Sequence, residues 1–198
     1  EFVEGGLKIE ESIKIARTLE SYGIDAINVS SGTYESATTI IEPGSYPQGW
    51  KKHLAEAVRK NVKIPVIAVN NIKDPETAEQ LLKSEVCDFI GIGRATLADP
   101  YWVKKAKDGK SDQIRKCIGC LNCFAELNQG RHIKCTVNAT LGRELEFSDL
   151  NFNGQGNTVA VIGGGPAGMQ AALVLDQRGY NTVLFDDREK LGGTLNVA

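Results

Sequence analysis

The sequence has 198 residues, of which 41% are hydrophobic and 24% charged, and its formal net charge is -2. These totals fit ordinary soluble globular material with one or two cores of common domain size, and the small net charge argues against a strongly basic nucleic-acid surface. No apolar run approaches the roughly 18 residues that a membrane span needs, so we expect neither a nucleic acid nor a membrane as partner.

The two ends and the cysteine content indicate the context of the chain. It begins Glu1-Phe2-Val3 without an initiator methionine or a signal sequence, and it ends Asn196-Val197-Ala198 without a terminal motif. We therefore expect a fragment of a longer protein. Five cysteines, four of them between residues 117 and 135, fit a metal or cluster site in a reducing compartment better than a disulfide framework. We expect a cytoplasmic protein.

From residue 7 to about residue 108 the pattern alternates between helix and strand, which is typical of βα units around a parallel sheet. We predict a first helix from residue 9 that ends at Gly23, followed by a strand at 25–29, a helix around 50–58 and a strand at 65–69. A helix at 74–83, capped by Asp74 and Pro75, comes next. A strand at 89–93 and a helix opened by Asp99-Pro100 complete the series. The three strands are nearly all apolar, so we expect them to be covered on both faces.

The remainder of the chain changes character twice. Residues 109–145 are polar and Cys-rich, and residues 146–156 have the asparagines and glycines of a linker. Beyond them we predict a strand at 159–162, a helix at 166–178 and a second strand at 182–185. The predicted domains are therefore 1–108, a Cys-rich segment at 109–145, a linker at 146–156 and a new domain at 157–198.

The cysteines Cys117, Cys120, Cys123 and Cys135 have the spacing Cys-x2-Cys-x2-Cys-x11-Cys. Three thiolates on a tight turn can reach three corners of an iron-sulfur cubane, and a distant fourth closes the set. The alternative is a tetrahedral zinc site, although all-cysteine zinc sites more often consist of two separated Cys-x2-Cys pairs. We expect the fifth cysteine, Cys87, to be a small core hydrophobe.

A dinucleotide fingerprint follows the first strand of the last domain. Gly163, Gly165 and Gly168 have Gly-x-Gly-x-x-Gly spacing between a predicted strand and helix, and Asp186 follows the next strand. The glycines provide a tight turn, a close approach to pyrophosphate and close helix packing, while the acid binds ribose hydroxyls. Thr194 follows in Leu191-Gly192-Gly193-Thr194, at a distance typical of two-dinucleotide flavoproteins. The alternative is a glycine turn that only packs helix on strand.

Two strand-end loops could hold a phosphate. In a (β/α)8 barrel the loops after strands seven and eight commonly do so through backbone N–H groups. Here the candidates are Asn70 and Asn71 in one loop and Gly93 and Arg94 in the next, with Arg94 as a planar donor. The alternative is that the glycines relieve crowding and Arg94 caps a loop.

The order of these motifs resembles one enzyme family over nearly the whole chain. The segment Asp88 to Pro100, then Cys117-Ile-Gly-Cys120, then Cys135-Thr-Val-Asn138, then the glycine fingerprint are similar to the Old Yellow Enzyme-related NADH:flavin oxidoreductases with an iron-sulfur cluster. That family includes 2-enoate reductase, 2,4-dienoyl-CoA reductase and trimethylamine dehydrogenase.

The resemblance implies an α/β fold: the C-terminal part of a (β/α)8 TIM barrel that binds FMN, a segment that binds a 4Fe-4S cluster, and the start of a Rossmann-like FAD/NAD(P)-binding domain. It also implies that electrons pass from NAD(P)H through FAD and the cluster to FMN and reduce an activated C=C bond, as in enoate or enoyl-type substrates. The implied ligands are the four cysteines for the cluster, Gly93 and Arg94 for FMN, and the fingerprint residues for FAD.

Three features depart from the family pattern. The loop after strand seven is often glycine-rich, whereas here it contains Asn70 and Asn71. The dienoyl-CoA reductases have one more residue between the second and third cysteines, so this chain has the spacing of enoate reductases and amine dehydrogenases. The loop at 30–36 lacks the substrate-side histidine of the dienoyl-CoA enzyme; Tyr34 and Glu35 are candidates to face flavin or substrate there, or are ordinary loop residues.

We expect three of eight barrel strands, and hence an internal fragment that is inactive without the remainder of its polypeptide. The expected partner is a small unsaturated molecule, and a homo-oligomer is left open. Two alternatives remain: an amine dehydrogenase with the same cofactors, and a zinc-stabilised nucleotide-binding module.

Overall fold

The structure, a computed structural model, describes residues 2–147 and 151–197. It divides into two compact units, unit 1 at residues 1–142 and unit 2 at residues 143–198. Part of the predicted linker, residues 148–150, lies outside the described residues. Among the helices described, none has both the length and the apolar character that crossing a membrane requires.

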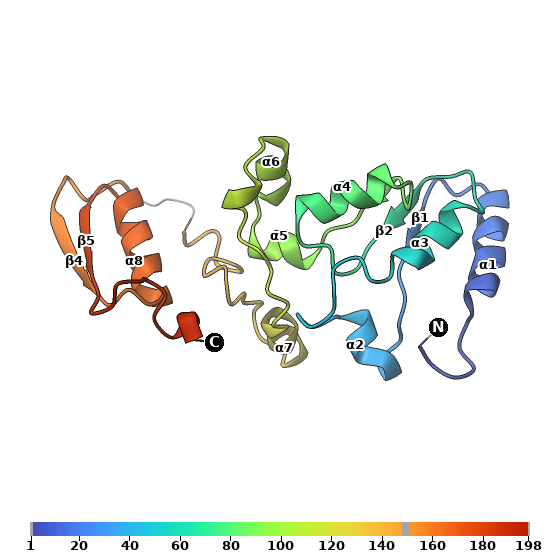
Figure 1. The fold of residues 1–198 in the computed structure, drawn as a ribbon, viewed down its shortest axis with the longest axis horizontal. Helices are drawn as coiled ribbons and strands as arrows, with labels where there is room; N and C mark the ends of the chain where they lie inside the picture. The colour runs from blue at the N-terminus through green and yellow to red at the C-terminus, as the bar shows by residue number, and fades with distance from the viewer. Residues whose placement is uncertain (1, 148–150, 198) are drawn as a thin grey trace. The chain divides into compact units, whose positions relative to one another are not determined.

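Unit 1 is built from parallel strands connected by helices (Figure 1). Its elements are α1 (Ile9–Ser21), β1 (Ile27–Val29), the 3-10 helix η1 (Tyr34–Ser36), α2 (Ala37–Ile40), α3 (Lys52–Arg59), β2 (Val66–Ala68), α4 (Pro75–Lys83), β3 (Phe89–Ile90), α5 (Arg94–Ala98), α6 (Trp102–Lys107), the 3-10 helix η2 (Ser111–Gln113) and α7 (Asn122–Asn128). The strands pair in the order β1-β2-β3, with Ile27 beside Val66 and Ala68 beside Ile90. The predicted helix–strand alternation of a parallel sheet is confirmed.

The core of unit 1 lies between β2 and the helices that flank it. Val66 is fully buried, and Val58 of α3 and Leu81 of α4 are nearly so. Burying one such side chain contributes about 1.5–3 kcal/mol. Cys87 belongs to the same core, and its burial raises the pKa of its thiol. The expectation that Cys87 acts as a core hydrophobe is confirmed.

The expectation that all three strands are covered on both faces is wrong for β1 and β3. Only β2 is buried at both ends, whereas Asn28 of β1 is exposed and Phe89 of β3 is 57% exposed. The reason is topological, since β1 and β3 are the outer strands of a three-stranded sheet and β2 is its centre.

The helix ends follow local chemistry. Asp74 caps α4 as predicted, because its Oδ1 accepts a hydrogen bond of 2.8 Å from the Thr77 amide and Pro75 occupies the first turn. Gly23 follows α1 with a positive φ of 89°, as expected of a residue that ends a helix. By contrast, α6 begins at Trp102, three residues later than Asp99, because a turn precedes the helix in which Asp99 Oδ1 accepts from the Tyr101 amide at 3.0 Å.

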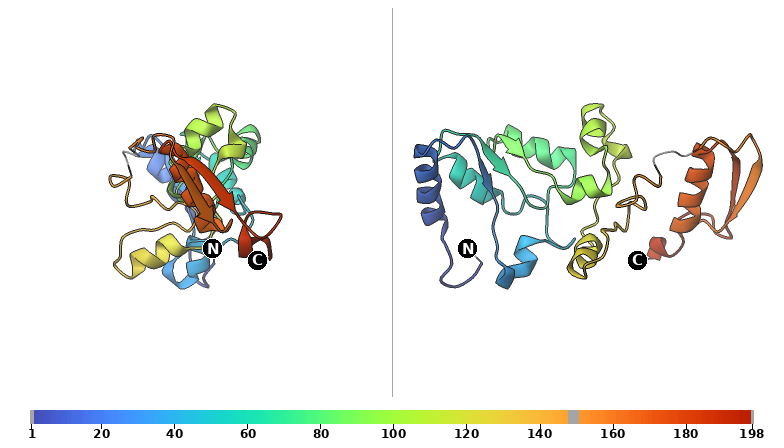
Figure 2. Two further views of the ribbon diagram at one scale, coloured as in Figure 1. Left: turned by 90° about the vertical axis from the view of Figure 1, so that its left-hand side faces the viewer. Right: turned by 180° about the vertical axis from the view of Figure 1, so that it is seen from behind.

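Unit 2 is a βαβ unit with elements β4 (Thr158–Ile162), α8 (Pro166–Gln177), β5 (Asn181–Phe185) and the 3-10 helix η3 (Gly193–Val197). The strands β4 and β5 are parallel, and Thr158 pairs with Asn181. The helix α8 packs against both strands, and Figures 1 and 2 show it alongside them. The predicted strand, helix and second strand are confirmed.

Candidate cofactor site

A cavity of unit 1 opens where the three parallel strands end. Its volume is about 510 Å³, within the range of small-molecule and cofactor pockets. It is lined by Asn28, Ile40, Ile41, Glu42, Val69, Asn70, Asn71, Ile72, Lys73, Gly91, Ile92, Gly93, Arg94, Ala95, Leu97, Cys117, Cys123, Phe124, Leu127 and Ile133. The structure therefore brings the two predicted phosphate loops and two of the four cysteines to one cavity, which we call the strand-end cavity.

The loop after β2 presents an unusual backbone to this cavity. Asn70 and Asn71 have positive φ angles of 78° and 52°, a region that asparagine tolerates better than most residues with a side chain. This conformation explains how asparagine takes the position that glycine often has in the related family.

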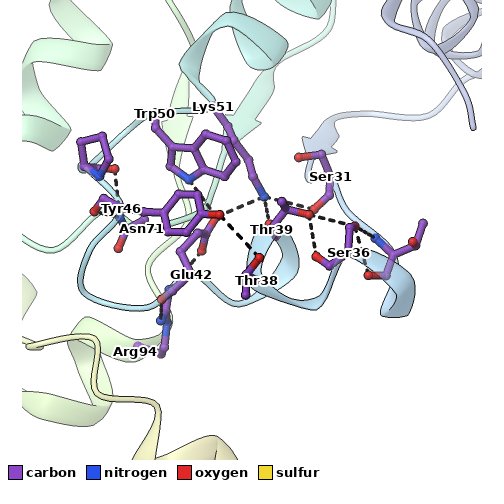
Figure 3. Close-up of polar contacts among 12 residues, drawn as sticks. Ser31, Ser36, Thr38, Thr39, Glu42, Tyr46, Trp50, Lys51, Asn71 and Arg94 are labelled. Carbon is purple, nitrogen blue, oxygen red and sulfur yellow. Dashed lines mark hydrogen bonds and ion pairs between the residues drawn. The ribbon is translucent and has the colours of Figure 1, made fainter. Parts of the chain in front are cut away.

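Asn71 also presents a buried acceptor. Its side-chain Nδ2 donates to the carbonyls of Tyr46 at 2.8 Å and Pro47 at 2.9 Å (Figure 3), and these two acceptors fix the orientation of the amide. Its Oδ1 is buried and has no hydrogen-bond partner among the described residues. An unsatisfied buried acceptor costs about 1–3 kcal/mol. A ligand that donates a hydrogen bond here would remove that cost.

Gly91 and Gly93 of the loop after β3 differ in their surroundings. A Cβ on Gly91 would lie 2.6 Å from Val69 Cγ1, so this glycine relieves crowding. A Cβ on Gly93 would meet nothing within 4 Å. Crowding therefore accounts for Gly91 but not for Gly93.

Arg94 is held by a residue that sequence reasoning missed. Glu42 is 1% exposed, its Oε2 lies 3.1 Å from Arg94 Nη2, and its backbone carbonyl accepts from Arg94 Nη1. On its other side Glu42 Oε1 lies 3.1 Å from Lys51 Nζ and accepts from Trp50 Nε1 at 3.2 Å. Glu42 lies in an irregular loop outside any motif. The one sequence signal that could have indicated its role is a charged residue between Ile41 and Pro43.

The charges at this wall do not balance. One carboxylate, Glu42, faces two cations, Lys51 and Arg94, and a charge removed from water is costly without a partner. One positive charge is left in excess, and Arg94 lines the strand-end cavity. The donor set at this wall therefore fits an anionic group such as a phosphate.

The four cysteines line a second, smaller cavity of about 20 Å³, which we call the cysteine cavity. Its walls are Arg94, Leu97, Cys117, Ile118, Gly119, Cys120, Leu121, Cys123, Cys135, Thr136 and Val137. Residues Gly119 and Leu121, which lie between successive cysteines, have positive φ angles of 67° and 60°. These reversals form the tight turn that brings the first three cysteines together.

The cysteine turn contacts a loop far away in the sequence. The Gly44 amide donates to the Gly119 carbonyl at 3.0 Å, and a Cβ on Gly119 would lie 2.7 Å from the Gly44 backbone. In both views of Figure 2 and in Figure 1, α2 and α7, which flank this contact, lie on the same side of unit 1. Two close-packed glycines thus join the turn to the loop that carries Glu42.

Two buried polar side chains tie the ends of the cysteine segment to the preceding helices. Asp99 Oδ2 accepts from Lys105 Nζ at 2.6 Å and from the Arg115 amide at 2.9 Å. Burial alone raises the pKa of Asp99, but these hydrogen bonds outweigh it and hold the pKa below its ordinary value. Near the fourth cysteine, Asn138 Nδ2 donates to the Leu97 carbonyl at 2.9 Å.

The thiols differ in their electrostatic surroundings. Burial raises the pKa of Cys123, and the nearby Cys117 and Cys135 raise it further against a lowering effect of Arg94. Burial also raises the pKa of Cys120, but hydrogen bonds, first that from Thr136, outweigh it and lower the pKa overall. Thiols that oppose each other's ionisation are a donor set that a cationic metal group would stabilise.

The arrangement of the four cysteines differs from that of a site for a single metal ion. Within residues 2–147 and 151–197, no group of three or more His, Cys, Asp or Glu side chains is arranged to hold a single metal ion. At about 20 Å³ the cysteine cavity has room for about one water molecule. His132, which lies three residues before Cys135 in the sequence, does not line this cavity.

The glycine loop of unit 2 has the geometry that the dinucleotide fingerprint requires. Gly163 has a φ of 102°, which makes the turn after β4. A Cβ on Gly165 would meet nothing within 4 Å, whereas a Cβ on Gly168 would lie 1.8 Å from the Gly163 carbonyl oxygen. The turn, the open approach and the close packing therefore fall on the three expected glycines.

Asp186 and Thr194 lie next to this loop. Asp186 accepts from the Gly164 amide at 2.6 Å and from the Arg188 amide at 2.8 Å, and these bonds lower the pKa of its carboxyl. Each carboxylate oxygen keeps a second lone pair for a ligand hydroxyl. Gly192, two residues before Thr194, donates to the Gly164 carbonyl at 2.8 Å. Asp186 therefore contacts the fingerprint loop directly, and Thr194 follows a segment that contacts it.

Tyr34 and Glu35 lie away from these sites. They belong to η1, and Tyr34 is 96% exposed. Neither residue lines the strand-end cavity. Their place near a flavin or substrate stays a prediction.

Both units match known protein families. Residues 1–113 match the model of the NADH:flavin oxidoreductase / NADH oxidase family, and residues 158–198 match that of FAD dependent oxidoreductases. A protein named NADH oxidase from Thermoanaerobacter brockii is 44% identical over 200 residues, which cover 100% of this chain and 31% of that protein. The chain thus spans about a third of the length of this curated relative.

Two solved structures match most of the chain. A 2-naphthoyl-CoA reductase in complex with 2-naphthoyl-CoA superimposes with a TM-score of 0.90 at 29% identity, covering 96% of this chain and 29% of that one. A histamine dehydrogenase from Rhizobium sp. 4-9 gives a TM-score of 0.83 at 30% identity, covering 93% and 27%. The chain is thus similar both to a reductase and to an amine-oxidising enzyme.

Proposed function

Because the chain belongs to the NADH:flavin oxidoreductase / NADH oxidase family, we propose that it is part of a reductase that carries FMN, FAD and a 4Fe-4S cluster. When bound, these groups move electrons from NAD(P)H through FAD and the cluster to FMN, which reduces an activated C=C bond of a small unsaturated substrate. The family is an oxidoreductase family; the cofactor chain and the substrate class are the proposal.

One observation carries this proposal: the predicted phosphate loops and two of the predicted cluster ligands share one cavity. Arg94 and Asn71 line the strand-end cavity, and so do Cys117 and Cys123. A flavin bound there would lie beside a metal group held by the cysteines. Close spacing of redox groups is what the protein has to supply for electron transfer.

Four residues at the strand-end cavity would contribute to binding. Arg94 would supply charge-assisted hydrogen bonds to the FMN phosphate, and Gly93 leaves space for a close approach. The Asn70–Asn71 backbone would add amide donors, and Asn71 Oδ1 would accept from the ligand. The excess positive charge beside Glu42 would be neutralised by the phosphate.

The cysteines and the glycine loop would hold the other two cofactors. Cys117, Cys120, Cys123 and Cys135 are the proposed cluster ligands, and their spacing and shared cavity support a three-plus-one set. In unit 2 the N-terminus of α8 would receive the pyrophosphate of FAD, and Asp186 would bind the adenosine ribose.

The architecture proposed for the whole protein follows from these roles. Residues 1–108 would form the last part of an FMN-binding TIM barrel, 109–145 the cluster segment, 146–156 a linker and 157–198 the start of the FAD/NAD(P) domain. The chain spans about a third of its relative, so the remaining strands and the proton donor would come from the rest of the polypeptide. We place this protein in the cytoplasm, where thiolate ligands stay reduced.

Cysteine variants of the full-length protein test the proposal. Cys135→Ala removes a proposed ligand, whereas Cys87→Ala is the matched control because Cys87 lies in the core and does not line the cysteine cavity. After anaerobic reconstitution with iron and sulfide, we expect Cys135→Ala to lose bound iron and the NADH-driven reduction of a conjugated enoate. Cys87→Ala should keep both.

The metal content decides between the cluster and zinc. A cluster gives broad visible absorption that dithionite bleaches, whereas zinc is redox-inert and colourless. Full iron content in Cys135→Ala, or one zinc per chain in the unmodified protein, would contradict the proposal.

An amine dehydrogenase is the second candidate, and the similarity to histamine dehydrogenase favours it. In that case a small amine, and not NAD(P)H, would reduce the flavin of the full-length protein. Anaerobic titration with NADH and with small methylated amines, followed by flavin absorbance, distinguishes the two candidates.

A further inference from the structure

Glu42 lies at the centre of the polar network in Figure 3, between Trp50 and Lys51 on one side and Arg94 on the other. Its carboxylate and its carbonyl both accept from the Arg94 guanidinium, through Nη2 and Nη1. Two contacts from one residue fix the plane of a guanidinium, because its donors form a rigid fork. Glu42 is 1% exposed, so water does not compete for this contact.

Arg94 lines both the strand-end cavity and the cysteine cavity, as do Leu97, Cys117 and Cys123. A guanidinium has five N–H donors, and Glu42 uses two of them. Among the described residues the other donors have no hydrogen-bond partner and can bind a ligand, and the direction in which they point depends on how Glu42 holds the guanidinium.

Glu42 is itself fixed from the opposite side. Lys51 Nζ contacts the Glu42 carboxylate at 3.1 Å and also donates to the carbonyls of Ser31, at 3.2 Å, and Thr39. Both ends of the Lys51 and Glu42 pair are buried, at 3% and 1% exposure. Lys51 therefore fixes the Glu42 carboxylate to the segment that follows β1, independently of the contact with Arg94.

We propose that Glu42 is a positioning residue that sets the Arg94 guanidinium for the phosphate of FMN at the boundary of the two cavities. The inference rests on the proposed function, in which Arg94 binds that phosphate. It adds a role for a residue that holds Arg94 and that no motif in the sequence marks.

Two effects of Glu42 on phosphate binding have opposite signs, which makes the inference testable. If Glu42 acted only through its charge, its neutralisation would strengthen phosphate binding, because more positive charge would face the cavity. If Glu42 positions Arg94, its neutralisation releases the guanidinium and weakens phosphate binding. Glu42→Gln keeps the side-chain size and removes the charge, so the sign of its effect distinguishes the two.

The experiment compares FMN with riboflavin, which lacks the phosphate, on the full-length apoprotein by fluorescence titration. Arg94→Met should weaken FMN binding about 10- to 100-fold, the range expected for losing hydrogen bonds to a charged group. Riboflavin affinity should stay within about twofold. Glu42→Gln should reduce the preference for FMN in the same way, and the double variant should show no further loss beyond Arg94→Met.

Asp99→Asn is the matched control. Asp99 is a second buried carboxylate, 3% exposed and paired with Lys105, and it lines neither cavity. Its neutralisation should cost stability as Glu42→Gln does and leave the preference for FMN over riboflavin unchanged. If Glu42→Gln does not fold, Glu42→Asp keeps the charge but withdraws the carboxylate from Arg94, and the same loss of preference is expected.

The outcomes separate the inference from the proposed function. An unchanged or increased FMN preference in Glu42→Gln, with a reduced preference in Arg94→Met, would overturn the positioning role alone. An unchanged preference in Arg94→Met would overturn the phosphate role of Arg94 and the inference with it. Additive losses in the double variant would also overturn it, because Glu42 would then act independently of Arg94.

Discussion

Gly165 and Gly168 follow β4, and glycine is present at these two positions for different structural reasons. Gly168 packs against the turn at Gly163, where an added Cβ would lie 1.8 Å from a carbonyl oxygen. Gly165 has an ordinary φ of -72° and open space where a Cβ would stand. Packing therefore requires glycine at position 168, whereas Gly165 is the N-cap residue of α8 and the position where we propose that the pyrophosphate approaches.

Alanine at each position should therefore give a different defect. In a helix interior Gly→Ala normally stabilises by about 1 kcal/mol, but at Gly168 the clash outweighs this and should destabilise unit 2 by roughly 1–3 kcal/mol. Gly165→Ala should leave thermal unfolding unchanged and weaken FAD binding at least about tenfold, because the pyrophosphate approaches there. Calorimetry and FAD titration of the full-length protein measure both. Unchanged FAD affinity in Gly165→Ala would contradict this site.

How far single residues could be predicted depends on whether their role is local. The roles of Gly163 and Gly168 follow from sequence, because turn and helix packing involve neighbouring residues. The role of Glu42 does not, since its partner Arg94 lies 52 residues away. Asn71 was a candidate from its position in the loop, but its buried Oδ1 depends on carbonyls from another loop.

At the level of elements, the cysteine turn is held on unit 1 by a contact between two glycines. Gly119 needs both its positive φ of 67° and its missing Cβ, because Gly44 lies against it. Gly130, after α7, has the same φ of 67° but nothing within 4 Å of an added Cβ. Substitution at Gly130 would add backbone strain alone, whereas substitution at Gly119 would add the same strain and also disturb the contact with Gly44.

Alanine at Gly119 and at Gly130 should differ in their effect on the metal site. Both variants acquire strain of about 1–2 kcal/mol from a side chain in the left-handed region. Only Gly119→Ala also pushes the cysteine turn away from Gly44, so it should lose bound iron after reconstitution while Gly130→Ala retains it. Iron content and visible absorption of the full-length protein give the result. Equal iron content in the two variants would show that the glycine contact is dispensable.

Element boundaries were predictable where a cap or a long apolar period marks them. Asp74 and Pro75 gave the start of α4, and Gly23 the end of α1. The short helices α2, α5 and α7 were not foreseen, because helices of one or two turns have little stability of their own and form through tertiary contacts. The helix α6 starts three residues after Asp99, because Asp99 Oδ1 accepts from the Tyr101 amide in a turn before the helix while Oδ2 binds Lys105 and Arg115.

At the level of the molecule, each unit leaves apolar side chains of its sheet open. Phe89 at the edge strand of unit 1 is 57% exposed, and in unit 2 Ile162 is 80% and Phe185 53% exposed. Large exposed apolar areas usually mark an interface. In the proposed full-length protein, further strands and helices would cover these surfaces.

The 198-residue chain alone should therefore behave differently from the full-length protein. We expect it to bind the dye ANS, to self-associate in sedimentation experiments and to lose FMN on dialysis, because its sheets are incomplete. The full-length protein should show none of these properties. A monomeric chain that retains stoichiometric FMN without ANS binding would contradict the proposed architecture.

The contact between Glu42 and Arg94 also has a consequence for the order of folding. The two residues are 52 positions apart, and closing so long a loop costs entropy before any contact is gained. The pairing of β1, β2 and β3 shortens that search, since it brings the loops after β1 and β3 to the same edge of the sheet. We therefore expect the cavity wall to form late, after the sheet, and the proposed cofactor to bind once unit 1 has folded.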